Sequence, residues 1–290
     1  MKLVTIDARE VAGRPGVLLD TGTILDLTAA PGSLSASQWI PQSTISILAA
    51  GERGLEHTQS LVEQVGESEA RLRQDGALSS LAGTALMAPI RRPGLILISQ
   101  AERDGFSASF IKSPNTAVGH AAQIRMHGQK ELVAHPMFAA VLGRPLYQAD
   151  KAGAEAALSA WTLVVDLAPA QDSPVDLAAW HEFTEARQFP GSLPMGPALV
   201  TLDEVASPGE LEALVRINGV MVWTGALGPS ADACVERLAH LSRSYAFSPG
   251  DVIAFEADAA GQSPHKKLQA NDVFSVSLGS VMELGFKLAG

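Results

Sequence analysis

Short apolar runs, separated by Gly, Pro and Asn, recur along most of the chain. Within residues 1–30, three such runs surround a Gly-containing turn: LVTI, GVLLD and TILDL. Apolar runs of this length with turn residues between them predict strands that pair as hairpins. We therefore expect the chain to begin with a small sheet.

Helical spacing replaces this pattern in the next part of the chain. Residues 43–66 and 68–82 are rich in Ala, Leu, Glu and Gln, and their apolar positions have the spacing of helices. We expect helices in these two segments, with Ser68 as the start of the second. Pro89 and Pro93 break any further helix, and the run GLILIS predicts a buried strand.

A change of pattern near residue 84 predicts a domain boundary. We expect a small α/β domain over residues 1–83 and a larger, mostly β domain over residues 84–290. The larger part contains many strand-like runs: SFIKSP, FAAVLG, WTLVVDLA, PALVTL, ALVRINGVMVW, DVIAFEA and DVFSVSLG. Helices are expected at 151–160 and 231–245, so the fold class is α+β with mostly β structure.

One hairpin is predicted at the level of its turn. Asn218 and Gly219 stand between the apolar runs LVRI and VMVW. This dipeptide accepts positive φ at both positions, as a type I′ turn requires. We expect a two-residue hairpin loop here.

Composition narrows the classes of function. Of the 290 residues, 47% are hydrophobic and 18% charged, which suits a globular protein with an ample core. The formal net charge of -10 argues against nucleic acid as a partner, because backbone recognition needs clustered Lys and Arg. The N-terminus lacks the apolar run of a signal peptide, and no stretch reaches about 18 apolar residues. We expect a cytoplasmic protein with no membrane partner.

The cysteine content excludes disulfides within the chain and metal clusters held by several cysteines. Cys234 is the only cysteine, so the chain forms no intramolecular disulfide and no thiolate metal cluster. Its helix-like context, ADACVERLAHL, predicts a buried structural thiol.

Longer phrases follow one another in a specific order along nearly the whole chain. The most specific are PMGPALVTLDEV, the Asn-Gly hairpin and PGDVIA; others are LMAPIRRPGLILIS, SFIKSPNTAVGHAAQI and WTLVVDLAPAQD. In this order they resemble the fumarylacetoacetate hydrolase family. The resemblance implies a catalytic domain with a rolled mixed β-sheet, usually as a homodimer. It also implies Mg2+ or Mn2+ as cofactor, and cleavage, decarboxylation or isomerisation of small dicarbonyl compounds and 2-oxo acids.

The positions that match the family's metal ligands carry other residues here. Counted back from AAVLG, the family's Glu-x-Glu pair falls on His135 and Met137, and Asp166 matches the remaining ligand. A thioether does not suit a hard cation, and imidazole is the wrong class of ligand for Mg2+. We therefore expect no cofactor; Mg2+ or Mn2+ follows only from the resemblance, with Asp166 as a ligand. An even register shift, which keeps side chains facing the same way, could still bring in Glu131.

Other catalytic positions of the family are changed as well. Its Lys position falls on Arg187, which keeps the positive charge and can clamp a carboxylate with two hydrogen bonds. The Asp that follows in the family is Pro190 here. The family's water-activating His and Glu fall on Gly105 and Ala108. Mg2+ catalysis of the family's kind is therefore not expected.

Three further residues are expected to bind substrate because of their place in the family's segments. Lys112, in SFIKSP, matches a Lys that supports the pocket, and Glu256, in FEADAAG, stands where the family has a hydroxyl-bearing loop. His265 belongs to a basic loop near the pocket mouth and is expected to help capture an acidic substrate. A purely structural Lys112 and a solvated His265 remain the alternatives.

Two functions follow from these residues. The first is an enzyme of C–C hydrolase, lyase or isomerase type, acting on a small carboxylic or dicarbonyl substrate. In it, His135 or Asp166 is the acid/base group, and Arg187 grips the substrate carboxylate. The second is a catalytically silent relative that serves as a binding protein or partner subunit. An ordinary hydrogen-bonded His135 and a structural Asp166–Arg187 ion pair are the simpler alternatives.

Overall fold

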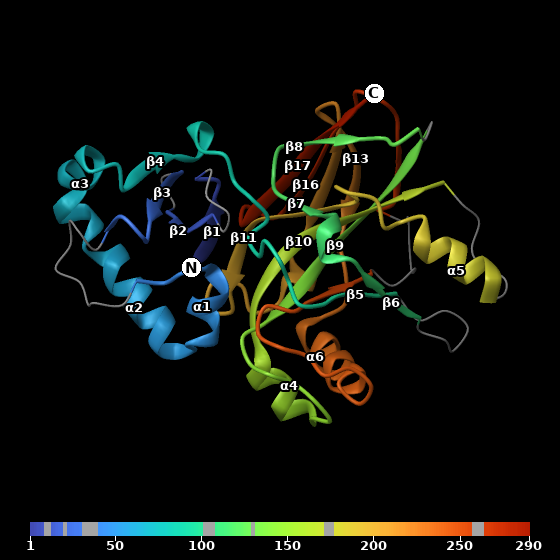
Figure 1. Ribbon diagram of the computed structural model, residues 1–290, viewed down its shortest axis with the longest axis horizontal. Coiled ribbons are helices and arrows are strands. Elements are labelled where there is room, and N and C mark those ends of the chain that lie inside the picture. Colours follow the sequence, from blue (N-terminus) through green and yellow to red (C-terminus); the bar gives the residue numbers. More distant parts are fainter. Residues whose placement is uncertain are drawn as a thin grey trace.

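The computed structural model describes residues 1–8, 13–19, 22–30, 40–100, 108–128, 131–170, 177–256 and 264–290. In these stretches a 12-stranded sheet and a 5-stranded sheet form the framework. Figure 1 shows the N-terminal elements in blue on the left, beside the long central strands, with the smaller sheet at the top of the view.

The described residues of the N-terminal part form short strands and three α-helices. They are β1 (Lys2–Ile6), β2 (Arg14–Leu18), β3 (Thr23–Asp26), α1 (Thr44–Ala49), α2 (Glu52–Glu63), α3 (Val65–Gln74) and β4 (Leu78–Ser80). β2 and β3 pair in the antiparallel direction, which confirms the expected hairpin. The helical structure expected over residues 43–66 is present as α1 and α2, which are separated by Ala50 and Gly51.

The second expected helix has different ends. α3 covers Val65–Gln74, whereas the sequence predicted a helix over 68–82. Gly76 follows the helix with φ 71, and the Ala77 amide donates a hydrogen bond of 2.8 Å to the Leu72 carbonyl. A glycine in this left-handed conformation terminates a helix, so the chain turns into β4 instead of continuing.

The larger sheet carries the site. Its order is β4-β3-β2-β1-β11-β10-β9-β14-β5-β6, while β7 pairs with β11 and β15 with β9. The strands not yet given are β5 (Ile96–Ser99), β6 (Ser109–Lys112), β7 (Ala117–Val118), β9 (Leu132–Leu142), β10 (Leu158–Pro169), β11 (Leu193–Thr201), β14 (Val252–Phe255) and β15 (Lys266–Leu268). β9 and β10 consist mostly of buried apolar residues. A polar side chain on either strand therefore needs a partner.

The smaller sheet has the order β13-β12-β16-β17-β8. Its strands are β8 (Ala122–Arg125), β12 (Ala213–Ile217), β13 (Val220–Gly225), β16 (Val273–Leu278) and β17 (Met282–Ala289). Asn218 and Gly219 join β12 to β13 with φ of 53 and 79, which confirms the predicted hairpin turn. Buried side chains of both sheets, such as Leu163 and Phe274, belong to one core cluster.

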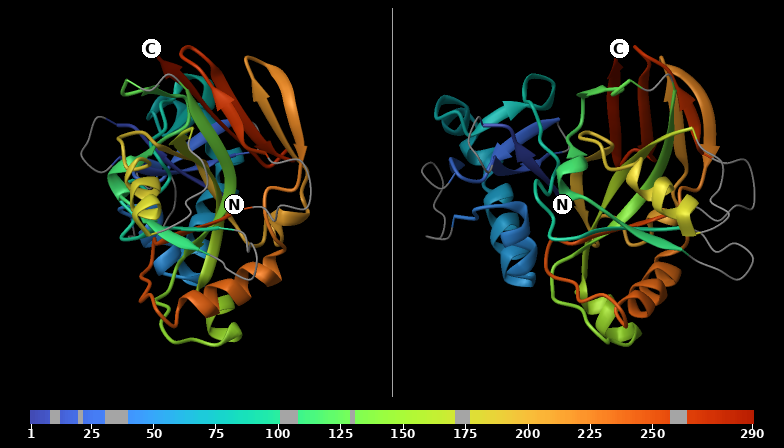
Figure 2. Two further views of the ribbon diagram at one scale, coloured as in Figure 1. Left: turned by 90° about the vertical axis from the view of Figure 1, so that its right-hand side faces the viewer. Right: turned by 45° about the vertical axis from the view of Figure 1, so that its right-hand side comes forward.

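Among the described residues, short 3-10 helices lie at Leu81–Gly83, Pro114–Thr116 and Pro208–Glu210, and three α-helices flank the larger part. They are α4 (Lys151–Ala157), α5 (Leu177–Glu185) and α6 (Ala231–Leu241). α4 and α6 were expected, though each ends earlier than the sequence indicated, and they pack together at one end of the molecule (Figure 2). Cys234 lies buried in α6, as expected, and burial raises the pKa of its thiol to about 12.

The expected fold class, α+β with mostly β structure, is confirmed. The domain boundary near residue 84 stays a prediction, because β1 pairs with β11 and the sheet continues from the N-terminal part into the larger part. Among the described residues, no helix combines the length and the apolar character needed to cross a membrane.

Candidate active site

The centre of the site is a pair of ionisable residues on neighbouring strands. His135 of β9 lies opposite Asp166 of β10 in the antiparallel register. Opposite residues point to the same face of a sheet, with Cβ atoms about 4.5–5.5 Å apart. The two polar side chains therefore share one face of an otherwise apolar pair of strands.

Asp166 lies between two cationic side chains. Lys112, the last residue of β6, donates a hydrogen bond from Nζ to Asp166 Oδ1, and Arg187 donates from Nη1 to Asp166 Oδ2. All three side chains are buried. Burial alone would raise the pKa of Asp166, but the charges of Lys112 and then Arg187 outweigh it and hold this pKa below its usual value. Asp166 is therefore an ionised counter-ion with both oxygens engaged.

Aromatic side chains hold the Arg187 guanidinium from the other side. Its Cζ lies 3.9 Å from the ring centroid of Phe183 in α5 and 5.7 Å from that of Phe110 in β6. These distances are within the range of cation–π attraction. Arg187 Nε is buried without a hydrogen-bond partner among the described residues. The stacking and the Asp166 bond together fix this side chain.

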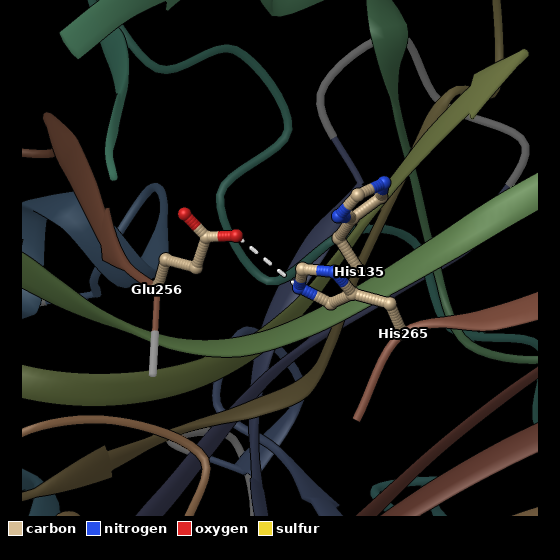
Figure 3. Close-up of side chains that lie close together, drawn as sticks. All are labelled: His135, Glu256 and His265. Atoms are coloured by element: carbon tan, nitrogen blue, oxygen red, sulfur yellow. Dashed lines mark ion pairs between the residues drawn. The ribbon is translucent and has the colours of Figure 1, made fainter. Parts of the chain in front are cut away.

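A third strand adds an imidazole on the other side of His135. β15 pairs with β9 so that Lys266 lies opposite Ala134, and this register, continued by one residue, puts His265 beside His135. The two rings lie 4.0 Å apart between centroids, at 53°. His265 Nε2 is 3.2 Å from Oε1 of Glu256, whose side chain is buried. Figure 3 shows these three side chains converging.

His135 is a neutral imidazole near pH 7. Burial is the largest cause that lowers its pKa from 6.5 to about 3; the charges of His265 and Arg187 add to it, and those of Asp166 and Glu256 offset it in part. The residue keeps some contact with solvent although protein atoms surround most of it. A neutral imidazole offers one nitrogen lone pair to a proton or to another ligand.

The remaining positions matched to the family's chemistry lie apart from this cluster or carry no ionisable group. Met137 is 1% exposed and belongs to an apolar core cluster. Glu131 precedes β9, and its Oε2 lies 2.9 Å from Nζ of Lys267. It is four residues from His135, which is about 13 Å along an extended chain. The observed register thus leaves Glu131 outside the cluster. Gly105 lies outside the described residues.

All six residues singled out from the sequence lie in one contiguous cluster: His135, Asp166, Arg187, Lys112, Glu256 and His265. The Asp166–Arg187 ion pair was anticipated, but Lys112 as a second partner of Asp166 was missed. So was the contact between Glu256 and His265. Lys112 and Asp166 are 54 residues apart, so no local sequence pattern joins them. The catalytic and binding roles of the six stay predictions.

A hollow of about 840 Å³ lies elsewhere, lined by residues of the N-terminal strands and the smaller sheet. Lys2, Glu204 and Glu283 line it together with apolar side chains. We assign chemistry to the ionisable cluster because buried charges and shifted pKa values mark reactive sites better than volume does.

Comparison with known proteins identifies the family. The sequence model described as "Fumarylacetoacetate (FAA) hydrolase C-terminal" matches residues 97–289, which include every residue of the cluster. The chain belongs to the fumarylacetoacetate hydrolase family. The resemblance drawn from the ordered sequence phrases is thereby confirmed.

Individual members of the family resemble the chain over most of its length. Oxaloacetate tautomerase YisK of Bacillus subtilis (strain 168) is 26% identical over 286 residues, covering 92% of this chain and 93% of that protein. Two solved structures share the fold over 100% of this chain and 99% of theirs. Maleylpyruvate hydrolase of Sphingobium sp. SYK-6, in complex with manganese (II) ion and pyruvate, has a TM-score of 0.72 at 18% identity. Fumarylacetoacetate hydrolase of Exiguobacterium antarcticum has a TM-score of 0.73 at 21% identity.

Proposed function

We propose that this chain is an enzyme acting on a small enolisable dicarbonyl compound or 2-oxo acid, without the family's usual Mg2+ site. The reaction is of the isomerase, lyase or C–C hydrolase type. The named relatives support the substrate class, since one is an oxaloacetate tautomerase and another a maleylpyruvate hydrolase bound to pyruvate.

One observation carries the proposal: six ionisable side chains meet inside the β framework around His135 and Asp166. Burying charges costs free energy, and replacing such clusters by apolar residues often stabilises a protein. A cluster of this kind with shifted pKa values is therefore a candidate for function rather than for stability.

The residues at the family's metal positions do not suit a hard divalent cation. Met137 offers only a buried thioether, and both oxygens of Asp166 already accept hydrogen bonds from cationic side chains. Mg2+ needs carboxylate or carbonyl oxygens and near-octahedral geometry. Lys112 and Arg187 supply the positive charge beside Asp166 instead.

The two cations of the cluster, Lys112 and Arg187, suit an anionic substrate. Enolisation places negative charge on a carbonyl oxygen, and fixed positive charges in a buried site stabilise such charge strongly. Arg187 and Lys112 supply that field, and Arg187 is the group that favours a substrate carboxylate. Asp166 serves as their counter-ion, because its lowered pKa and engaged oxygens make it a poor base. His135 is the neutral imidazole beside these two charges.

The test is turnover of small oxo acids, beginning with oxaloacetate and acylpyruvates, read out as tautomerisation, decarboxylation and C–C cleavage. We expect activity on at least one compound, a loss of about 100-fold or more in His135→Gln, and no change with added Mg2+. His240→Gln, in an exposed position on α6, is the matched control.

Two results would contradict the proposal. A large rate increase on adding Mg2+ would mean that the family's metal chemistry is retained. No turnover of any compound by folded protein would favour the silent binding protein or partner subunit, in which the Lys112–Asp166–Arg187 contacts are purely structural.

A further inference from the structure

Three side chains that can act as metal ligands converge beside Lys112 and Arg187. One ligand atom each from His135, Glu256 and His265 can be chosen so that all lie within 4.8 Å of one another. Glu256 is buried, and the two histidines are partly exposed. The three side chains come from different segments and point toward one another (Figure 3).

The strand ladders fix this arrangement. His265 continues the β15–β9 register next to His135, and Asp166 lies on the opposite side of His135. Glu256 directly follows β14, which pairs with β9, and the same register continued by one residue sets it beside Met137. Met137 and His135 point to the same face of β9, because they are two residues apart. The carboxylate missing at Met137 is thus supplied by the adjacent strand.

The donor set is that of a borderline transition metal rather than of Mg2+. Two imidazoles and one carboxylate bind Zn2+ in hydrolytic enzymes, and the same set with open positions binds Fe2+. Donors at about 2.0–2.2 Å from a tetrahedral Zn2+ lie roughly 3–3.5 Å from one another. His265 Nε2 and Glu256 Oε1 are already 3.2 Å apart, so these two donors have the spacing of ligands on one ion.

We propose that His135, His265 and Glu256 bind one divalent transition-metal ion of the Zn2+ or Fe2+ class. This site replaces the all-carboxylate family site with donors drawn from β9 and its two neighbours, β14 and β15. The charges around the site agree with this proposal. Asp166 faces two cations, whereas Glu256 faces the imidazole of His265 and lies beside that of His135. The bound ion leaves positive charge facing an acidic substrate.

The inference goes beyond the proposed function, because metal uptake is measured without turnover. The metal-free alternative is that Glu256 and His265 form a hydrogen-bonded pair against which His135 packs. It predicts no stoichiometric binding of any divalent ion, so the two readings give opposite results.

Untagged protein is stripped with EDTA, dialysed and titrated with Zn2+ by calorimetry and with Co2+ by visible absorption. We expect one ion per chain, Co2+ bands typical of a four- or five-coordinate site, and no binding of Mg2+. His265→Gln and Glu256→Gln should each weaken Zn2+ binding by about 100-fold or more, since even outer-shell changes cost 10–100-fold. His240→Gln is the control.

Unfolding curves in EDTA verify that each variant is folded. A second readout needs no variant: in Co2+-loaded wild-type protein, proton NMR should reveal two strongly shifted imidazole N–H signals. Absence of stoichiometric Zn2+ and Co2+ uptake by wild type, or undiminished uptake in both variants, would overturn the inference. Metal uptake without turnover would leave it standing while the proposed function fails, and Mg2+-independent turnover without uptake would do the reverse.

Discussion

At Asp166, two cationic side chains meet one carboxylate in a position that is 1% exposed. Such a contact contributes little net stability when complete, because desolvation offsets the attraction between the charges. Its loss is costly, since the partners would remain buried without a counter-ion. Removal of the Asp166 carboxylate should therefore destabilise the protein, even though the complete cluster contributes little to its stability.

The first prediction follows from this asymmetry. Asp166→Asn should lower the free energy of unfolding by about 3–5 kcal/mol, because Lys112 and Arg187 lose their carboxylate inside the protein. Urea unfolding measures the difference. Glu69→Gln, which removes an exposed i,i+4 pair with Arg73, should leave stability nearly unchanged. Equal effects of the two substitutions would contradict the assigned role of Asp166.

His135 gives a prediction about pH in metal-free protein. Its folded-state pKa of about 3 lies below the ordinary 6.5, so the unfolded chain binds a proton that the folded protein does not. The stability associated with the neutral ring is present above about pH 6.5 and is lost as the pH falls toward 3. His135→Gln should therefore lose less stability than wild type between pH 7.5 and pH 4.5. Urea unfolding in EDTA at both values measures it, and identical losses would refute the lowered pKa.

Among the secondary-structure elements, backbone conformation decides where an added methyl group stabilises or destabilises. Gly219 has φ of 79 in the β12–β13 turn, and a Cβ added there meets open space. Gly219→Ala should destabilise by about 1 kcal/mol, since only the strained backbone opposes it. Gly66, in α3, also faces open space but in helical conformation, so Gly66→Ala should stabilise by up to about 1 kcal/mol. Thermal unfolding of the pair tests the opposite signs.

Whether a feature depends on local or on distant residues explains what sequence patterns could predict. The Asn218–Gly219 turn, the strand runs and most of the helices depend on local preferences, and they were predicted; α5 was not. The Gly76 stop of α3 was missed, because the pattern continued through it. All six site residues were named and the Asp166–Arg187 pair was anticipated, but the other contacts were not. Lys112 meets Asp166 across 54 residues, and His265 reaches His135 only through the β15–β9 ladder. Pairing between distant strands carries no local signal.

At the scale of the whole molecule, edge strands are the places where a sheet can pair with another chain. The larger sheet ends at β4 and β6, and the smaller one at β13 and β8. β13 exposes three consecutive apolar side chains, Val220, Met221 and Val222, at 65%, 57% and 38%. An exposed apolar edge strand invites pairing with another chain. This strand is our candidate for the contact in the expected homodimer.

The dimer prediction follows from that edge. Wild-type protein should be dimeric by size-exclusion chromatography with light scattering, and Met221→Lys should shift it toward monomer, because a buried unpaired charge at the contact is costly. Tyr147→Lys, at a position 58% exposed and outside the smaller sheet, should leave the mass unchanged. The site residues lie outside β13, so the Met221→Lys monomer should retain one metal ion per chain. A wild-type monomer at every concentration would refute the dimer, and a dimeric Met221→Lys would move the contact away from β13.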